Sequence, residues 1–324
     1  MTSIPDLVTP EFRALSARLG QDPLQVQGPG GNTSIKADGV MWIKASGTEL
    51  ADAERQNIFV PVDRKAALAE AQGKAGDGSC KATVLDPSIK LRPSIETTFH
   101  AALDHAVVLH THSVATLVHA VSDEGIAAVK DKLAGLPYAI VPYAMPGLPL
   151  TREILDRARP DTKIFVLRNH GLIGCGASVQ DAAATIAEVE RRLAMPADYA
   201  APTPTSPAQV DGFAWSDHGW LAYQARATDA ILAGSYYPDH VVFLGPGLPA
   251  EDHDAKPPAI LRRGEGVLLR DGATSSQAAM LKCLADLFAR LPEDWTPLAI
   301  GEKAEAELLN WDAEKYRQAL AARR

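Results

Sequence analysis

The hydrophobic residues of the first 195 positions follow two alternating patterns. Short runs of branched aliphatic and aromatic residues are typical of strands. Segments in which apolar residues recur every third or fourth position are typical of helices. Strands are predicted as a hairpin over 33–47, turned at Asp38-Gly39, and at 58–63, 107–109, 138–145 and 163–176. Helices are predicted at 9–20, 64–72, 94–103, 113–121 and 178–195, and the Gly-, Asp- and Pro-rich stretch 73–93 predicts a loop.

The periodic pattern stops at residues 196–209, PADYAAPTPTSPAQ. Proline, alanine and threonine without hydrophobic periodicity are typical of a linker. We therefore place a domain boundary there, with one domain over 1–200 and a smaller one over 210–324. Because helices and strands recur on both sides of the boundary, the predicted fold class is α/β.

The second domain shows a weak similarity to the first. Residues 167–193 and 261–291 share Leu-Arg, a polar pair, Gly, an apolar run, Gly-Ala and an Ala-rich helix, and 104–112 resembles 239–247. The similarity predicts a strand at 241–244 and a degenerate repeat that binds no metal; the alternative is an unrelated appended domain. The alignment sets Gly245, Gly247 and Glu265 against His110, His112 and His170.

Charge and composition exclude several classes of protein. The net charge is −8 and no basic stripe occurs, which argues against a nucleic-acid partner. No apolar run approaches the roughly 20 residues of a membrane span, and the N-terminal residues show no basic-then-apolar signal pattern. Three widely spaced cysteines favour reduced thiols over a disulfide framework. We therefore expect a cytoplasmic protein.

Two histidines follow the predicted strand 107–109 at alternate positions. Side chains alternate between the faces of a strand, so His110 and His112 point the same way. With His170 at the end of another strand, they would give the three protein ligands and open position of a catalytic zinc. The alternative is a set of core histidines satisfied by hydrogen bonds. Three other histidines lack this pattern and are interpreted as structural or solvated: His100, His105 and His119.

A carboxylate and two glycine-rich turns accompany the histidines. Glu96 lies on a predicted helix just upstream; it could be a general base, or simply an acidic residue favoured in the first turn of a helix. The turns 28–34 and 44–48 flank the hairpin and offer backbone N–H groups, hydroxyls and the charge of Lys44 to a phosphate. Ser94, at a helix N-terminus, would add to the same anion site.

Five motifs carry a resemblance to the class II, zinc-dependent aldolase/adducin family. In order they are GPGGNTSIK, KASGTEL, PSIETTFHAAL, VVLHTHSVAT and LRNHGLIGCG, within residues 10–195. The sequence resembles most the fuculose- and rhamnulose-phosphate aldolases and the aldolase part of aldolase–dehydrogenase fusions. The resemblance implies an α/β/α fold with a central, mostly antiparallel sheet, and a homotetramer with sites between subunits.

The resemblance also implies residue roles. Zn²⁺ would be bound by His110, His112 and His170, and Glu96 would be the acid/base residue. The substrate phosphate would be held by Gly31, Asn32, Ser46, Gly47 and Ser94. Family aldolases often use a tyrosine to protonate the leaving group, and five residues qualify: Tyr138, Tyr143, Tyr236, Tyr237 and Tyr316.

The expected function is a zinc-dependent aldolase that cleaves a ketose phosphate to dihydroxyacetone phosphate, or an analogue, and an aldehyde. Sugar-phosphate epimerases of the family typically carry Asp where this sequence has Glu96, which favours the aldolase branch. The alternatives are an epimerase, a decarboxylase of an oxo-acid phosphate, and a non-catalytic assembly protein.

Overall fold

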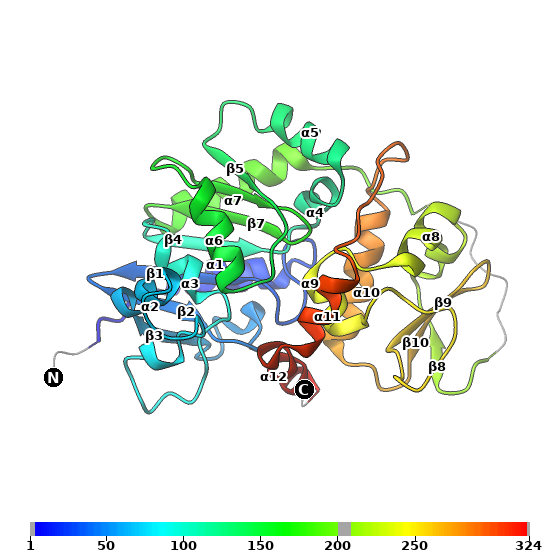
Figure 1. The fold of residues 1–324 in the computed structure, drawn as a ribbon, viewed down its shortest axis with the longest axis horizontal. Coiled ribbons are helices and arrows are strands. Elements are labelled where there is room, and N and C mark those ends of the chain that lie inside the picture. The colour runs from blue at the N-terminus through cyan, green and yellow to red at the C-terminus, as the bar shows by residue number, and fades with distance from the viewer. Residues whose placement is uncertain (1–3, 200–208, 323–324) are drawn as a thin grey trace.

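A seven-stranded sheet forms the centre of the first 195 residues in the computed structural model, which describes residues 4–199 and 209–322 (Figure 1). The strand order is β3-β2-β1-β4-β7-β6-β5, and every neighbouring pair is antiparallel except β5–β6. This confirms the predicted α/β class and mostly antiparallel sheet. The strands are β1 (Asn32–Ala37), β2 (Val40–Lys44), β3 (Phe59–Asp63), β4 (Val107–Thr111), β5 (Tyr138–Val141), β6 (Ile164–Leu167) and β7 (Gly171–Gly176).

Helices cover both faces of this sheet. On one face, α1 (Pro10–Gln21), α4 (Val114–Ala120) and α7 (Val179–Leu193) pack on the strands, with α5 (Asp123–Lys132) against α4. On the other lie α2 (Arg64–Ala71), α3 (Thr97–Ala102) and α6 (Leu148–Arg157). The alternation along β4 follows from this, since Val107 and Leu109 join the first core and Val108 the second. Helices α5 and α6 were not among the predicted elements.

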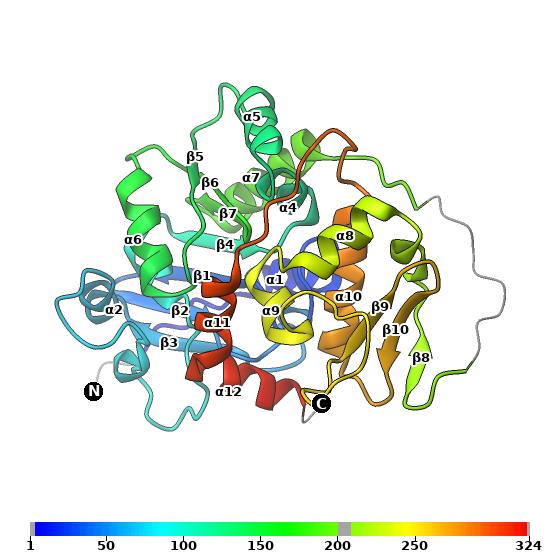
Figure 2. The same ribbon diagram turned by 45° about the vertical axis from the view of Figure 1, so that its right-hand side comes forward.

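Residues 209–322 form a second, smaller sheet with its own helices, which lies beside the seven-stranded sheet (Figure 2). A three-stranded antiparallel sheet has the order β8-β10-β9, and both views place α9 and α10 between the two sheets. The elements are β8 (Phe213–Trp215), α8 (Ala225–Ala233), α9 (Pro238–Leu244), β9 (Ala259–Arg262), β10 (Gly266–Arg270), α10 (Ser275–Phe288), α11 (Glu302–Asn310) and α12 (Asp312–Ala321).

Helix α4 belongs to both parts of the molecule. Its Val114, Leu117 and Val118 lie in one continuous apolar core with residues of α8, α9, α10 and the small sheet. The C-terminal segment therefore packs on α4, the helix that begins two residues after His112. The predicted linker 196–209 lies for the most part outside the described residues.

The prediction of a strand at 241–244 is wrong. Residues 238–244 form helix α9, which begins with Pro238 at its first position and ends at Gly245 with φ +90°. Proline at the start and glycine after the end are typical of a helix. All seven residues are buried, so no periodicity distinguished a helix from a strand. The repeat hypothesis thereby loses the strand that equated Gly245 and Gly247 with His110 and His112.

Two further observations concern the whole chain. The three cysteines, Cys80, Cys175 and Cys283, are buried and free. Among residues 4–199 and 209–322, none of the helices combines the length and the apolar character that crossing a bilayer requires.

Candidate metal centre

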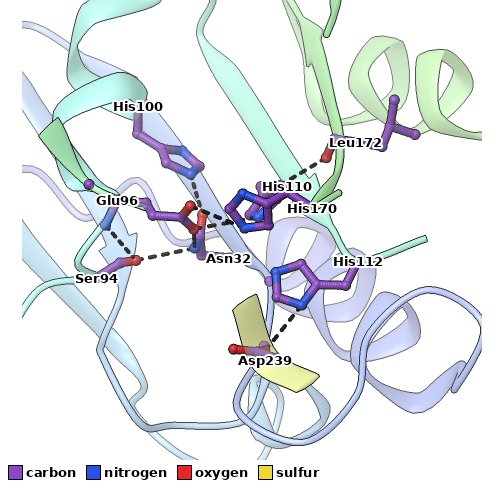
Figure 3. Close-up of polar contacts among 12 residues, drawn as sticks. Asn32, Ser94, Glu96, His100, His110, His112, His170, Leu172 and Asp239 are labelled. Carbon is purple, nitrogen blue, oxygen red and sulfur yellow. Dashed lines mark hydrogen bonds and ion pairs between the residues drawn. The ribbon is translucent and has the colours of Figure 1, made fainter. Parts of the chain in front are cut away.

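The three predicted histidines meet at the end of β4. His110 lies on β4, His112 follows it, and His170 lies in the turn between β6 and β7. Because β4 pairs with β7, with Thr111 opposite Leu172, this turn is brought beside the histidine pair. One ring nitrogen from each histidine lies within 4.8 Å of the other two, and all three side chains are buried (Figure 3).

The nitrogen atoms of this cluster fit a metal. His110 Nδ1 lies 3.0 Å from the Leu172 carbonyl oxygen, which can only accept, so Nδ1 donates and Nε2 keeps its lone pair. His110 Nε2 and His170 Nδ1 have no hydrogen-bond partner among the residues that the structure describes. Burial lowers the pKa of His110 to about 4 and that of His170 to about 3, so both are neutral at pH 7. Three buried imidazoles whose ring nitrogens lie this close together can hold a divalent cation.

Glu96 lies against two of the histidines. Glu96 is the residue immediately before α3. Its Oε2 lies 3.5 Å from His110 Nε2, and its Oε1 lies 3.6 Å from His170 Nε2. Burial raises its pKa, but the two histidines and a 2.8 Å hydrogen bond from Asn32 Nδ2 lower it, and the net shift is downward. The carboxylate is therefore charged at neutral pH and lies within reach of anything bound to the triad.

His100 holds this carboxylate in place through Asn32. Its Nε2 donates to Asn32 Oδ1, and its Nδ1 lies 2.7 Å from Ser34 Oγ. Asn32 is thereby oriented with Nδ2 toward Glu96 and toward Ser94 Oγ at 3.1 Å (Figure 3). His100, which the sequence pattern predicts to be structural or solvated, is fully buried and positions Glu96 through Asn32. Its spacing of four residues from Glu96 was the available signal.

A pocket beside the triad gathers all six residues predicted to bind phosphate. The pocket is partly open to solvent, and its inner part has a volume of about 20 Å³, room for about one water molecule. The Ser46 hydroxyl has no hydrogen-bond partner within the described part of the chain. Lys44 is committed elsewhere, because its Nζ contacts the carbonyl oxygens of Pro29, Gly30 and Gly31 at 2.7–3.3 Å. The pocket is lined by Gly31, Asn32, Lys44, Ser46, Gly47 and Ser94, together with Glu96, His112 and His170.

Two charged residues of the C-terminal segment line the same pocket. They are Asp239 of α9 and Arg317 of α12, and the sequence analysis missed both. Neither lies in a motif, and both are far from the histidines along the chain, so only the docking of α9 and α12 reveals them. None of the five candidate tyrosines, all of them described, lines this pocket; Tyr316 lines a neighbouring cavity of about 530 Å³.

A family model and a solved structure show what this chain is similar to. The family model described as "Class II Aldolase and Adducin N-terminal domain" matches residues 12–196. A solved N-terminal class II aldolase domain of a conserved protein from Thermoplasma acidophilum is 27% identical, with a TM-score of 0.51, covering 60% of this chain and 95% of that one.

Two curated relatives are similar over parts of their length. "Uncharacterized oxidoreductase YuxG" of Bacillus subtilis is 28% identical over 176 residues, 49% of this chain and 25% of its own. A "3-oxo-tetronate 4-phosphate decarboxylase" of Escherichia coli is 32% identical over 113 residues, 31% of this chain and 52% of its own. The chain thus spans about half or less of the curated relatives it matches.

Proposed function

The chain belongs to the class II aldolase and adducin family, and from this premise we propose that it is a zinc-dependent aldolase. Its substrate is a ketose phosphate, and its products are dihydroxyacetone phosphate, or a close analogue, and an aldehyde. The observation that carries the proposal is the contact of Glu96 with two of three buried histidines, each of which has one ring nitrogen within 4.8 Å of the other two. The family resemblance adds a homotetramer, which light scattering of the purified protein tests.

The reaction breaks the C3–C4 bond of the ketose. The C4 hydroxyl gives its proton to a base or to water as the aldehyde forms, the electron pair of the broken bond stays next to the C2 carbonyl, and C3 then takes up one proton, so that one proton is released and one is consumed. A divalent cation held by the histidines would act as a Lewis acid on the carbonyl oxygen and stabilise this negative charge. Glu96 moves the proton at C3, and Asn32 and His100 keep its carboxylate oriented.

The substrate phosphate is bound by the turns around residues 31–32 and 46–47 and by Ser94. The free Ser46 hydroxyl supports this assignment, and Lys44 acts by shaping the turn. The neighbouring cavity of about 530 Å³ also has Ser46 in its wall and offers room for the rest of the substrate. Arg317 of α12 lines the phosphate pocket from the C-terminal side.

The second candidate function is decarboxylation of an oxo-acid phosphate. It is favoured by the 32% identity to a 3-oxo-tetronate 4-phosphate decarboxylase over 113 residues. Loss of carbon dioxide from such an acid also leaves an electron pair next to a carbonyl, so the same site serves both reactions. The two differ in the bond that breaks and in the product that leaves.

One experiment separates these reactions. Zinc-loaded protein is incubated with dihydroxyacetone phosphate and a panel of aldehydes, and separately with 3-oxo-acid phosphates. The proposal predicts new ketose phosphates in the first set and none when dihydroxyacetone replaces its phosphate. Release of carbon dioxide in the second set, without any ketose phosphate in the first, would make the protein a decarboxylase.

A further inference from the structure

Asp239 contacts one of the three histidines from the opposite end of the chain. It lies on α9, is 1% exposed, and places Oδ2 3.2 Å from His112 Nδ1 (Figure 3). A carboxylate oxygen only accepts hydrogen bonds, so this contact puts the proton on Nδ1. It leaves Nε2 as the nitrogen of His112 that offers a lone pair.

We propose that Asp239 is a positioning residue that fixes His112 as a metal ligand, so that the C-terminal segment completes the metal centre. This inference rests on the proposed function, because it takes the triad to be a metal site. The proton of His110 is held on Nδ1 in the same way, but by the sheet itself, where the Leu172 carbonyl oxygen accepts from Nδ1. His112 lies beyond the end of β4, where no backbone carbonyl of the described residues accepts from its ring, and α9 supplies the acceptor instead.

Asp239 is itself held by helix α12. The guanidinium of Arg317 contacts both carboxylate oxygens, Nη1 to Oδ1 at 2.9 Å and Nη2 to Oδ2 at 3.2 Å. Nη1 also contacts both oxygens of Glu314 at 2.8 and 3.0 Å. Paired planar contacts of this kind fix orientation as well as position. The chain of contacts therefore runs from α12 through Asp239 to the imidazole of His112.

The loop at Gly30 is shaped to this pair. A Cβ atom at Gly30 would lie 2.8 Å from His112 Nδ1 and 2.9 Å from Asp239 Oδ2. Both distances are too short for a real side chain, so only glycine allows the loop to close over the contact. This observation is independent of α12 and points to the same two atoms.

The test is the affinity for zinc, measured by competition with a chromophoric chelator. Carboxylates behind metal-binding histidines typically contribute 10- to 100-fold in affinity. We expect Asp239→Asn to bind zinc roughly 10- to 100-fold more weakly than the wild type, because its amide places a donor against either His112 or Arg317. Gly30→Ala is expected to weaken binding in the same direction by displacing the pair.

Asp286→Asn is the matched control. It changes another buried aspartate of the C-terminal segment, one that pairs with Lys282 and Arg290 and not with the histidines of the triad. We expect its zinc affinity to stay within about threefold of the wild type, well inside the effect expected for an outer carboxylate. Wild-type affinity in Asp239→Asn, or an equal loss in Asp286→Asn, would overturn the inference and leave the zinc proposal standing. A wild-type protein that binds no zinc would instead refute the metal centre itself.

A measurement on the unmutated zinc protein decides the matter if Asp239→Asn does not fold. Long-range proton–nitrogen NMR correlations distinguish the two imidazole nitrogens, and His112→Gln assigns the signals. The inference predicts a proton on Nδ1 of His112 and metal on Nε2. Metal on Nδ1 would contradict it.

Discussion

At the scale of single residues, hydrogen bonds fix the side chains around the triad. Asn32 donates to Glu96, His100 donates to Asn32, and the Leu172 carbonyl accepts from His110. A buried polar group without a hydrogen bond costs free energy. Among the described residues His110 and His170 each keep one ring nitrogen without a partner, and these atoms are available to a bound ligand. This residue-level pattern supports the metal centre more strongly than the motif spacing alone.

The proposed role of Glu96 predicts the behaviour of Glu96→Gln. Glutamine has nearly the same shape but cannot take up a proton, so we expect kcat to fall by roughly 10²-fold or more with zinc retained. Glu70→Gln is the control, since Glu70 is equally buried but caps the N–H groups of Gly78 and Cys80. Turnover and zinc content are measured on each protein. Near-normal turnover in Glu96→Gln would remove this residue from the mechanism.

A buried histidine outside the site gives a prediction for pH. Burial lowers the pKa of His119 to about 4, below the 6.5 of an unfolded chain. The unfolded state therefore binds the proton first, so this contribution to stability is complete above pH 6.5 and is lost as the pH falls toward 4. For His119 the loss between pH 7.5 and 5.5 is about 1.4 kcal/mol.

His119→Gln removes this titration. Urea unfolding of the metal-free protein at pH 7.5 and 5.5 should show a smaller pH dependence in the variant, by about 1.4 kcal/mol. An unchanged pH dependence would mean that His119 titrates alike in the folded and unfolded states.

At the scale of elements, the strands and helices around the triad followed from local patterns. The hairpin at Asp38-Gly39, the strand 107–109 and the helix capped by Ser178 all occur, each within a few residues of its predicted bounds. The hairpin and helix α7 have exposed as well as buried positions, so their period is visible in the sequence, whereas β4 is buried throughout and was indicated by its run of branched aliphatic residues. Helix α9 is buried all round and showed no period, and only its Pro238 and Gly245 marked it as a helix.

Close backbone packing joins the last residue of β7 to the first turn of α7. A Cβ atom at Gly176 would lie 2.2 Å from the backbone nitrogen of Ala182, which cannot move without shifting α7. We expect Gly176→Ala to lower the free energy of unfolding by about 1–3 kcal/mol. Gly219→Ala is the control, because the nearest atom to its added Cβ is 3.7 Å away. Equal urea midpoints for the two variants would contradict this packing argument.

At the scale of the whole molecule, the candidate site is built from both ends of the chain. The histidines, Glu96 and the two glycine-rich turns lie in motifs, and the sequence predicted them as site residues. Asp239 and Arg317 could not be predicted, because nothing in their local sequence places α9 and α12 over β4. That placement depends on the shared core of α4 with the C-terminal helices, which is a property of tertiary packing.

Closure of the pocket by α12 predicts where the molecule opens. Leu320 packs over the turn at Gly47, where a Cβ atom would lie 2.4 Å from its Cδ1. Because Leu320 lies over a turn that we propose binds the substrate, we expect the last turn of α12 to open locally and its amides to exchange hydrogen faster than those of the core helix α7, while Arg317 keeps its contact with Asp239. Hydrogen exchange with mass spectrometry checks this. Exchange as slow as in α7 would place the entrance elsewhere.

The metal content of the purified protein tests the account most directly. Zinc is measured per chain after equilibration with the ion and removal of the excess, in the wild type, in His110→Ala and in His119→Ala as a control outside the triad. The account predicts about one zinc per chain in the wild type and in His119→Ala, and loss of most of it in His110→Ala. A wild type without bound metal, or a His110→Ala variant that keeps its full zinc content, would contradict it.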